Sequence, residues 1–170
     1  MTAETLTRSP LIIAASGGLG GTVKRQYFAY VIGAAVEADD VFRLGWIPKN
    51  CLVVGGNIAT TDIDTGTETL DVDVGWEANG GGSATWTDPN TGLTFTNAGS
   101  TLDADGFADV GVMTGDGIAQ VYQAGVNYRE IVLPVPLFFS ERTMVTLTAV
   151  APSHGGHTGT YGVYLDYLMT

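Results

Sequence analysis

The stretch "ETLDVDVGWE" (Glu68–Glu77) alternates apolar and polar residues, and this alternation decides the fold class. Successive side chains of a β-strand point to opposite faces. Every second residue from Leu70 to Trp76 therefore falls on one apolar face, while Asp71 and Asp73 fall on the other. The pattern predicts a strand with one buried and one solvated face.

Further strands are predicted by similar alternation, and helical periodicity is almost absent. These strands span 23–36, 40–47, 51–59, 106–113, 117–125, 130–138, 142–150 and 160–168. Clusters of Gly, Pro, Asn and Asp lie between them, as expected for turns. Strands in this number and at this spacing predict an all-β protein, a jelly-roll-like β-sandwich with an extended N-terminal arm. A barrel is the alternative architecture.

The N-terminal residues 1–21 are expected to form a polar arm and a glycine joint, and residues 22–170 the β-sandwich domain. The glycines between 17 and 21 look like a nucleotide-binding turn, but such a turn must open a helix. Here a strand-like sequence follows, and Lys24 precedes Arg25 where a phosphate-binding loop needs Ser or Thr. We therefore expect no nucleotide cofactor.

Charge and cysteine content limit the possible partners. The 170 residues carry seven Lys and Arg against eighteen Asp and Glu, a net charge of −11, with no basic residue between Lys49 and Arg129. This acidity would repel phosphates, so nucleic-acid binding is not expected. The chain has one cysteine, no signal-peptide pattern and no long apolar run. We expect a protein made in a reducing cytoplasm, without a membrane partner.

Two groups of carboxylates are candidate sites. Asp71 and Asp73 have a strand spacing that resembles an inverting glycosidase pair, yet nothing in the sequence separates their pKa values. Asp103, Asp105 and Asp109 resemble part of a calcium loop. The loop lacks a carboxylate or amide before its glycine and a final Glu, so a plain Asp-Gly turn is favoured.

Other reactive residues give no catalytic or metal-binding pattern. His154 and His157 flank two glycines but would need zinc ligands from elsewhere. Cys51 begins an apolar strand and is expected to be a small buried side chain. Ser83 lacks the Gly-x-Ser-x-Gly pattern of a nucleophile elbow. The sequence therefore predicts a non-enzymatic protein with no cofactor and no metal.

The segment "IVLPVPLFF" is a candidate oligomer interface. Two prolines two residues apart lack amide donors on one side, which suits an edge strand. An apolar edge needs a cover, either another copy of the chain or the 78–105 loop. The candidate interface residues are Ile131, Leu133, Pro134, Pro136, Leu137, Phe138 and Phe139.

The region from Asp39 to Trp76 resembles a segment recurrent in small virion proteins of tailed bacteriophages. An apolar-x-apolar strand, 42–46, leads through Pro48 into a second apolar strand, 52–58, followed by an acidic Thr/Gly hairpin and a strand that ends near "DVG". The resemblance implies a head-associated or decoration protein, built as a β-sandwich and displayed in multiple copies on the capsid; the expected role is to bind and stabilise the outer shell as a homo-oligomer, with a trimer favoured. It also implies the major capsid protein as partner and a place on the outer surface of the virion.

The implied contact with the shell involves the less acidic end of the chain, where Arg8, Lys24 and Arg25 are the candidate capsid contacts. Two alternatives remain, a tail or fibre component of a virion and a carbohydrate-binding jelly roll. The second would need an exposed aromatic side chain. Trp76 shares the parity of the core residues and Trp86 is expected to anchor a loop, so neither favours a sugar platform.

Overall fold

The computed structural model describes residues 6–12, 22–61, 69–109, 126–153 and 159–170, and their regular structure is β except for the 3-10 turn η1 (Ala98–Ser100). The side chains of residues 6–12 and 126–129 are not among those described. The larger sheet has the order β1 (Leu6–Ile12), β2 (Thr22–Ile32), β12 (Gly159–Met169), β4 (Cys51–Thr61) and β10 (Leu137–Phe139), with β9 (Val126–Ile131) also paired to β4. The smaller sheet has the order β3 (Val41–Ile47), β11 (Thr143–Ala151), β5 (Asp71–Trp76) and β8 (Asp103–Ala108). A separate hairpin joins β6 (Thr85–Thr87) to β7 (Thr94–Thr96).

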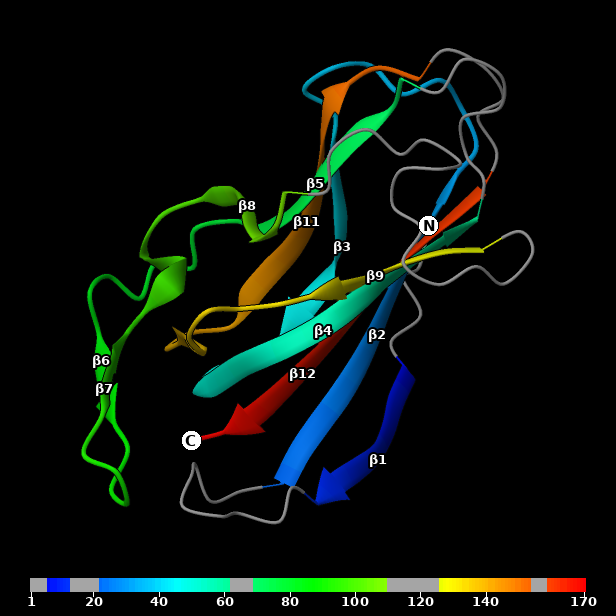
Figure 1. Ribbon diagram of the computed structural model, residues 1–170. Coiled ribbons are helices and arrows are strands. Elements are labelled where there is room, and N and C mark those ends of the chain that lie inside the picture. The colour runs from blue at the N-terminus through cyan, green and yellow to red at the C-terminus, as the bar shows by residue number, and fades with distance from the viewer. Residues whose placement is uncertain (1–5, 13–21, 62–68, 110–125, 154–158) are drawn as a thin grey trace.

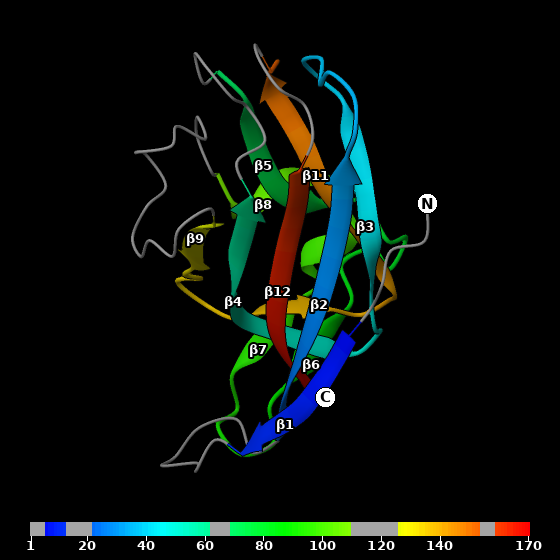
Figure 2. The same ribbon diagram turned by 90° about the vertical axis from the view of Figure 1, so that its right-hand side faces the viewer.

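The two sheets form a jelly-roll-like sandwich, as predicted (Figures 1 and 2). The chain passes from one sheet to the other at β2 to β3, β3 to β4 and β4 to β5, and again at β8 to β9, β10 to β11 and β11 to β12. Each sheet thus gathers strands that are distant in sequence, and every described pairing between its strands is antiparallel. This crossing pattern is the one that defines a jelly roll.

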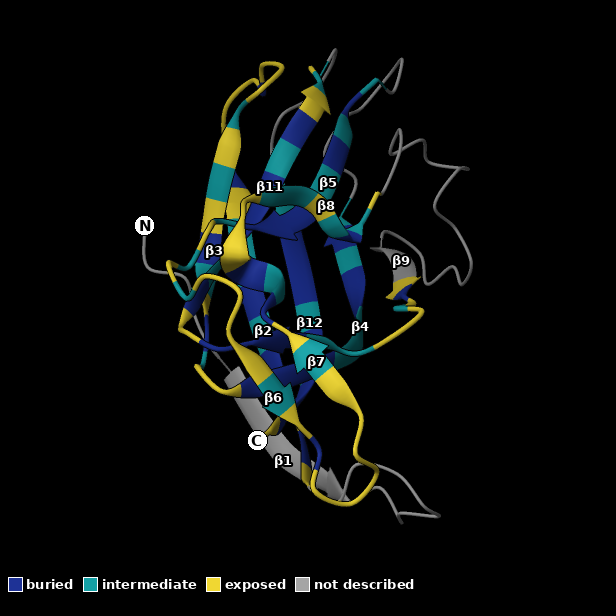
Figure 3. Ribbon diagram, turned by 90° about the vertical axis from the view of Figure 1, so that its left-hand side faces the viewer, coloured by how far each residue is buried: buried dark blue, intermediate teal, exposed yellow. Residues whose placement is uncertain are grey.

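The core lies between the sheets, where the rows of buried residues face one another (Figure 3). The alternation from Leu70 to Trp76 is confirmed, because Leu70, Val72 and Val74 are fully buried and Trp76 is 3% exposed. The Trp76 ring packs edge-on against Phe107 at 4.8 Å and Phe139 at 5.1 Å between centroids. Its indole N–H donates to the Thr101 carbonyl at 3.1 Å, so its polar atom is satisfied.

The Asp-Gly turn predicted near residue 105 is wrong, since these residues lie inside β8. Gly106 is required there by packing, because a Cβ atom at this position would collide with the Trp76 ring. Gly75 on the neighbouring strand has a similar constraint, since its Cβ would collide with the Asp103 carbonyl oxygen. The two glycines let β8 cross close to β5.

The predicted strand 130–138 is also wrong, because it is two strands. β9 ends at Ile131 and β10 begins at Leu137, with Pro134 and Pro136 between them. A proline has no amide hydrogen to donate to a neighbouring strand, so two prolines this close interrupt the ladder. The 78–105 region, predicted as a loop, contains the β6–β7 hairpin, η1 and the start of β8.

The part of the predicted arm that the structure describes is a strand. β1 pairs with β2 in the register Leu6 with Tyr27 and Arg8 with Arg25, which places it at the edge of the larger sheet. Residues 6–12 are therefore part of the sandwich. The predicted glycine joint, the strand predicted at 117–125 and the end of the strand predicted at 106–113 lie outside the described residues.

Candidate functional site

A second apolar cluster lies on the outward face of the larger sheet. Its buried members are Val23, Leu52, Phe138 and Leu168. The antiparallel register explains how they meet, because Leu52 is paired with both Leu168 and Phe138. The β6–β7 hairpin covers them with Trp86 and Phe95, whose rings stack at 5.9 Å. One end of the larger sheet is therefore packed on both faces.

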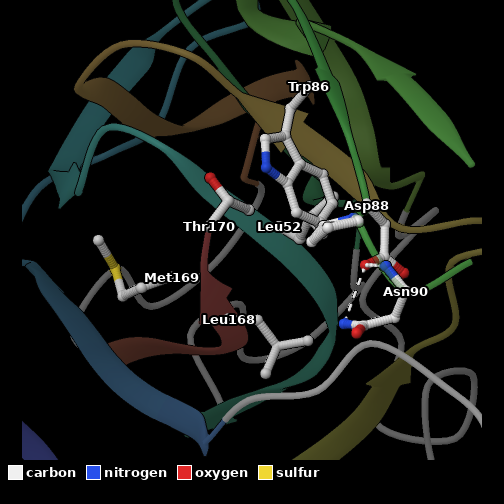
Figure 4. Close-up of a pocket in the computed structure, with 8 residues that line it drawn as sticks. Leu52, Trp86, Asp88, Asn90, Leu168, Met169 and Thr170 are labelled. Carbon is white, nitrogen blue, oxygen red and sulfur yellow. Dashed lines mark hydrogen bonds between the residues drawn. The ribbon is translucent and has the colours of Figure 1, made fainter. Parts of the chain in front are cut away.

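A pocket of about 220 Å³ opens between this hairpin and the end of β12 (Figure 4). We call it the hairpin pocket; it is lined by Leu52, Trp86, Asp88, Pro89, Asn90, Leu168, Met169 and Thr170. The pocket is several times larger than the roughly 30 Å³ that one water occupies in the liquid. Its wall is mainly apolar, and Met169 stands at 45% exposure. The pocket is therefore a mainly apolar recess beside the end of β12.

The carboxylate of Asp88 in this pocket is held by its own turn. Asp88 is 1% exposed, and it accepts hydrogen bonds from the Asn90 amide at 3.0 Å and the Thr91 hydroxyl at 2.5 Å. These bonds, the Thr91 hydroxyl first, lower the pKa of Asp88. A carboxylate with a lowered pKa that is occupied by its own loop is suited to fixing the loop and poorly suited to proton transfer at neutral pH.

The candidate interface segment is divided between interior and surface. Ile131, Phe138 and Phe139 are buried by the chain itself, and Leu133 and Leu137 pack partly against the core. Trp86 covers Phe138 at 6.3 Å between ring centroids. Of the two covers predicted for this segment, another copy of the chain or the 78–105 region, the second therefore covers part of it. The surface of the segment consists of Val132 at 75% exposure and Val135 at 59%, with exposed Pro134 and half-buried Pro136.

The candidate capsid contacts differ in their surroundings. Lys24 is exposed. Arg25 forms a two-pronged ion pair with Asp166, with nitrogen–oxygen distances of 2.7 and 2.6 Å, and lies over the Tyr164 ring at 5.8 Å. Its charge is therefore largely committed within the chain. The backbone of Arg8 is opposite Arg25 in the β1–β2 register.

The acidic residues do not assemble as the sequence patterns suggested. Burial and the charge of Asp109, the residue that follows β8, raise the pKa of Asp71. Burial and the carboxyl of Asp105 raise the pKa of Asp103. Asp109 therefore interacts with Asp71 while Asp103 interacts with Asp105. In the described part of the chain no group of three or more His, Cys, Asp or Glu side chains lies close enough to hold a metal ion.

The remaining reactive residues give little support to catalysis. Cys51 is buried, as predicted; its thiol donates to the Pro48 carbonyl at 3.1 Å, and burial raises its pKa to about 12. His154 and His157 lie outside the described residues. No helix in the described ranges is long and apolar enough to cross a membrane.

The aromatic residues considered for sugar binding are both used for packing. Trp76 belongs to the core and Trp86 anchors its hairpin, as predicted. Tyr27 and Tyr164 stack on the outward face of the larger sheet at 4.5 Å, so each ring covers a face of the other. Arg25 also lies over the Tyr164 ring at 5.8 Å, so this ring makes its contacts within the chain.

Sequence reasoning did not identify Trp46 as a surface residue. A bulge at Leu44 interrupts the alternation of β3, since Val145 pairs with Gly45 and Thr146 with Arg43. Leu44 is buried and Trp46 is 41% exposed, with the Arg142 guanidinium 4.7 Å from its ring centroid. The bulge has no clear sequence signal, so this contact could only be found from the fold.

Comparison with known proteins gives a structural likeness but no sequence family. No family model and no curated protein sequence matches the chain. A chain of the capsid asymmetric unit of cyanophage Pam1 aligns over 94% of both chains, with 18% identity and a TM-score of 0.56. A chain of the capsid of Ralstonia phage GP4 aligns over 96% of this chain and 92% of its own length, with 19% identity and a TM-score of 0.56. This chain therefore has, over nearly its whole length, the fold of chains from two phage capsids.

Proposed function

We propose that this chain is a non-enzymatic virion protein that decorates and stabilises the outer shell of a phage capsid. The observation that carries the proposal is the alignment over more than nine-tenths of the chain with a chain from each of two phage capsids. The virion role is independently suggested by the pattern from Asp39 to Trp76. The described carboxylates and Cys51 offer neither a metal cluster nor an activated thiol, which supports a structural role.

Attachment to one side of a shell agrees with the way the charges are distributed. Three acidic residues, Glu37, Asp39 and Asp40, lie in the β2–β3 connection, while Lys24 lies at the opposite end of β2. A molecule with two different ends can bind a surface with one and face the medium with the other. The net charge of −11 also disfavours contact with packaged DNA.

The decoration protein is proposed to act as a homo-oligomer, with a trimer favoured. The exposed part of the candidate interface supports this proposal, because Val132, Pro134 and Val135 form a short apolar surface between β9 and β10. Exposed apolar groups of this kind are stabilised when a second copy covers them. Arg8 and Lys24 remain the proposed contacts of the chain with the major capsid protein.

Sedimentation with empty shells tests the proposed function. The full chain is mixed with shells assembled from the major capsid protein of the same virion without this chain, and the particles are pelleted. We expect saturable co-sedimentation and a higher melting temperature of the decorated shells. A chain that stays in the supernatant over the whole concentration range would contradict a role in decoration.

Native mass spectrometry tests the oligomer separately. The double variant Val132→Asp/Val135→Asp should shift the protein toward monomers, since it places charges in the proposed interface. Leu93→Asp is the matched control, because Leu93 is 58% exposed on the hairpin, away from that segment. If the double variant and the control give the same distribution as the parent chain, the interface lies elsewhere.

A further inference from the structure

Three of the five lysine and arginine side chains that the structure describes lie toward one end of the sandwich. Lys24, Lys49 and Arg142 are all exposed there, although they are far apart in sequence. With Trp46 they make up a surface that we call the basic end. The opposite end, which we call the acidic end, carries Glu37, Asp39, Asp40 and Asp71. No lysine or arginine whose side chain the structure describes lies at the acidic end.

The strand registers explain why these cations meet. Lys24 at the start of β2 is opposite Tyr167 near the end of β12, and the Thr170 amide donates to the Asn50 carbonyl beside Lys49. The ends and beginnings of these strands meet on the lower side of the sandwich in Figure 1. The side-chain amide of Gln26 donates a hydrogen bond of 3.1 Å from Nε2 to the Trp46 carbonyl, which connects β2 with the end of β3 at the same end.

Trp46 and Arg142 give this end a composition suited to binding. Arg142 lies over the ring of Trp46 at 4.7 Å, and 41% of the Trp46 surface is exposed. Trp and Arg are enriched among the residues that dominate binding energies, and a cation held over an indole is already positioned for a partner. Pairing within the chain neutralises Arg25 through Asp166 and Arg43 through Glu77. Exposed Glu141 is the sequence neighbour of Arg142, and buried Asp88 in the hairpin pocket beside Thr170 is a further carboxylate on this side.

We propose that the basic end is the surface by which the chain docks on an acidic patch of the shell protein, so that the acidic end points to the medium. This inference rests on the proposed function and adds Lys49, Arg142 and Trp46 to the contact. Charge complementarity selects the partner: an acidic surface attracts the basic end and repels the other end of a molecule of net charge −11. The result is a single preferred orientation.

Two double variants that change the net charge equally but at opposite ends test the proposal. Lys49→Ala/Arg142→Ala removes two positive charges from the basic end. Ala35→Glu/Ala38→Glu adds two negative charges at exposed positions of the β2–β3 connection, at the acidic end. Both are mixed with the undecorated shells, and their affinity is compared with that of the parent chain. Thermal melts of the two variants alone verify that both are folded.

We expect Lys49→Ala/Arg142→Ala to bind the shells at least about tenfold more weakly, since truncation of a central arginine commonly costs more than one kcal/mol. The control should bind within about threefold of the parent chain, because it lies on the distant side. Raising the salt from about 50 to about 500 mM should weaken the parent chain more than the basic-end variant.

The possible results separate the two proposals. If the parent chain does not bind the shells at all, the proposed function fails. If it binds and both variants bind equally well, decoration stands and docking through the basic end is overturned. A parallel titration with a short double-stranded DNA tests whether the basic end binds nucleic acid instead of an acidic protein surface. DNA binding that is lost only in the basic-end variant would show that the surface recognises phosphates and would overturn an acidic protein as its partner.

Discussion

Replacement of Trp86 by alanine should release the β6–β7 hairpin from the sandwich. The hairpin has only three pairs of residues, and two such short strands are marginal without packing. Trp86 supplies that packing through Phe95, Phe138 and the buried cluster beneath. A tryptophan buries about 150–250 Å² when fully covered. For a partly buried indole, a loss of about 100–150 Å² at about 25 cal/mol per Å² gives about 2–4 kcal/mol.

Hydrogen exchange measures this loss locally. The Asp88 amide donates to the Leu93 carbonyl and the Asn97 amide to the Ala84 carbonyl, both at 2.8 Å, so both amides report on the closed hairpin. Their exchange should become about 30- to 1000-fold faster in the Trp86→Ala variant. Amides of β12 should change much less, because the main core is unaltered. Leu93→Ala, at an exposed position of the same hairpin, is the control and should change stability by less than about 0.5 kcal/mol.

Two outcomes would refute the reasoning. Unchanged exchange at Asp88 and Asn97 would mean that Trp86 does not hold the hairpin. Equal acceleration in the hairpin and in β12 would mean that the hairpin and the sandwich unfold as one unit, and the second cluster would then be part of the global core.

Three further predictions concern packing and ionisation. Gly75→Ala should lower the melting temperature by about 3–10 °C, because the new methyl group overpacks the contact between β5 and β8 and costs about 1–3 kcal/mol of stability. Gly33→Ala is the control and should leave the melting temperature unchanged, since the space around Gly33 is open. Asp71→Asn should raise the melting temperature at neutral pH, because the raised pKa of Asp71 means that its charged form destabilises the fold once the pH exceeds the pKa of the unfolded chain. Asp88→Asn should lower the melting temperature, because the lowered pKa of Asp88 means that its carboxylate stabilises the fold until acid protonates it. Equal melting temperatures for the two variants would contradict both signs. The thiol of Cys51, with its pKa of about 12, should resist a thiol reagent at about pH 8, where about one thiol in ten thousand is ionised. The same thiol should react promptly when the chain is unfolded in guanidinium chloride. Rapid labelling of the folded chain would show that the site opens.

The strands that alternate regularly could be predicted from the sequence, because a strand with one buried face has an apolar residue at every second position. Leu70 to Trp76 is the clearest case. The number of strands and the spacing of the turns between them were sufficient to predict a β-sandwich. Short strands such as "TWT" and "TFT" contain too few residues to display a period. The pair Pro134 and Pro136 indicated a missing hydrogen-bond ladder correctly, but the sequence did not show that the chain leaves the sheet there.

The surfaces were less accessible to sequence reasoning because they join distant residues. Lys24 was recognised as a contact, yet Lys49 and Arg142 become its neighbours only through the registers of β4, β11 and β12. The exposure of Trp46 depends on a bulge that shifts the alternation by one residue. The outward cluster under Trp86 likewise needs two strand pairings, Leu52 with Leu168 and Leu52 with Phe138.

The separation of charge between the two ends would give decorated particles a colloidal property. If every copy sits on its basic end, the particle surface repeats Glu37, Asp39 and Asp40 once per copy, and neighbouring particles repel each other electrostatically. That repulsion extends over about one Debye length, roughly 30 Å at 0.01 M salt and about 3 Å at 1 M. Decorated particles would then migrate faster toward the anode than bare shells, remain dispersed in dilute buffer, and approach one another closely in concentrated salt.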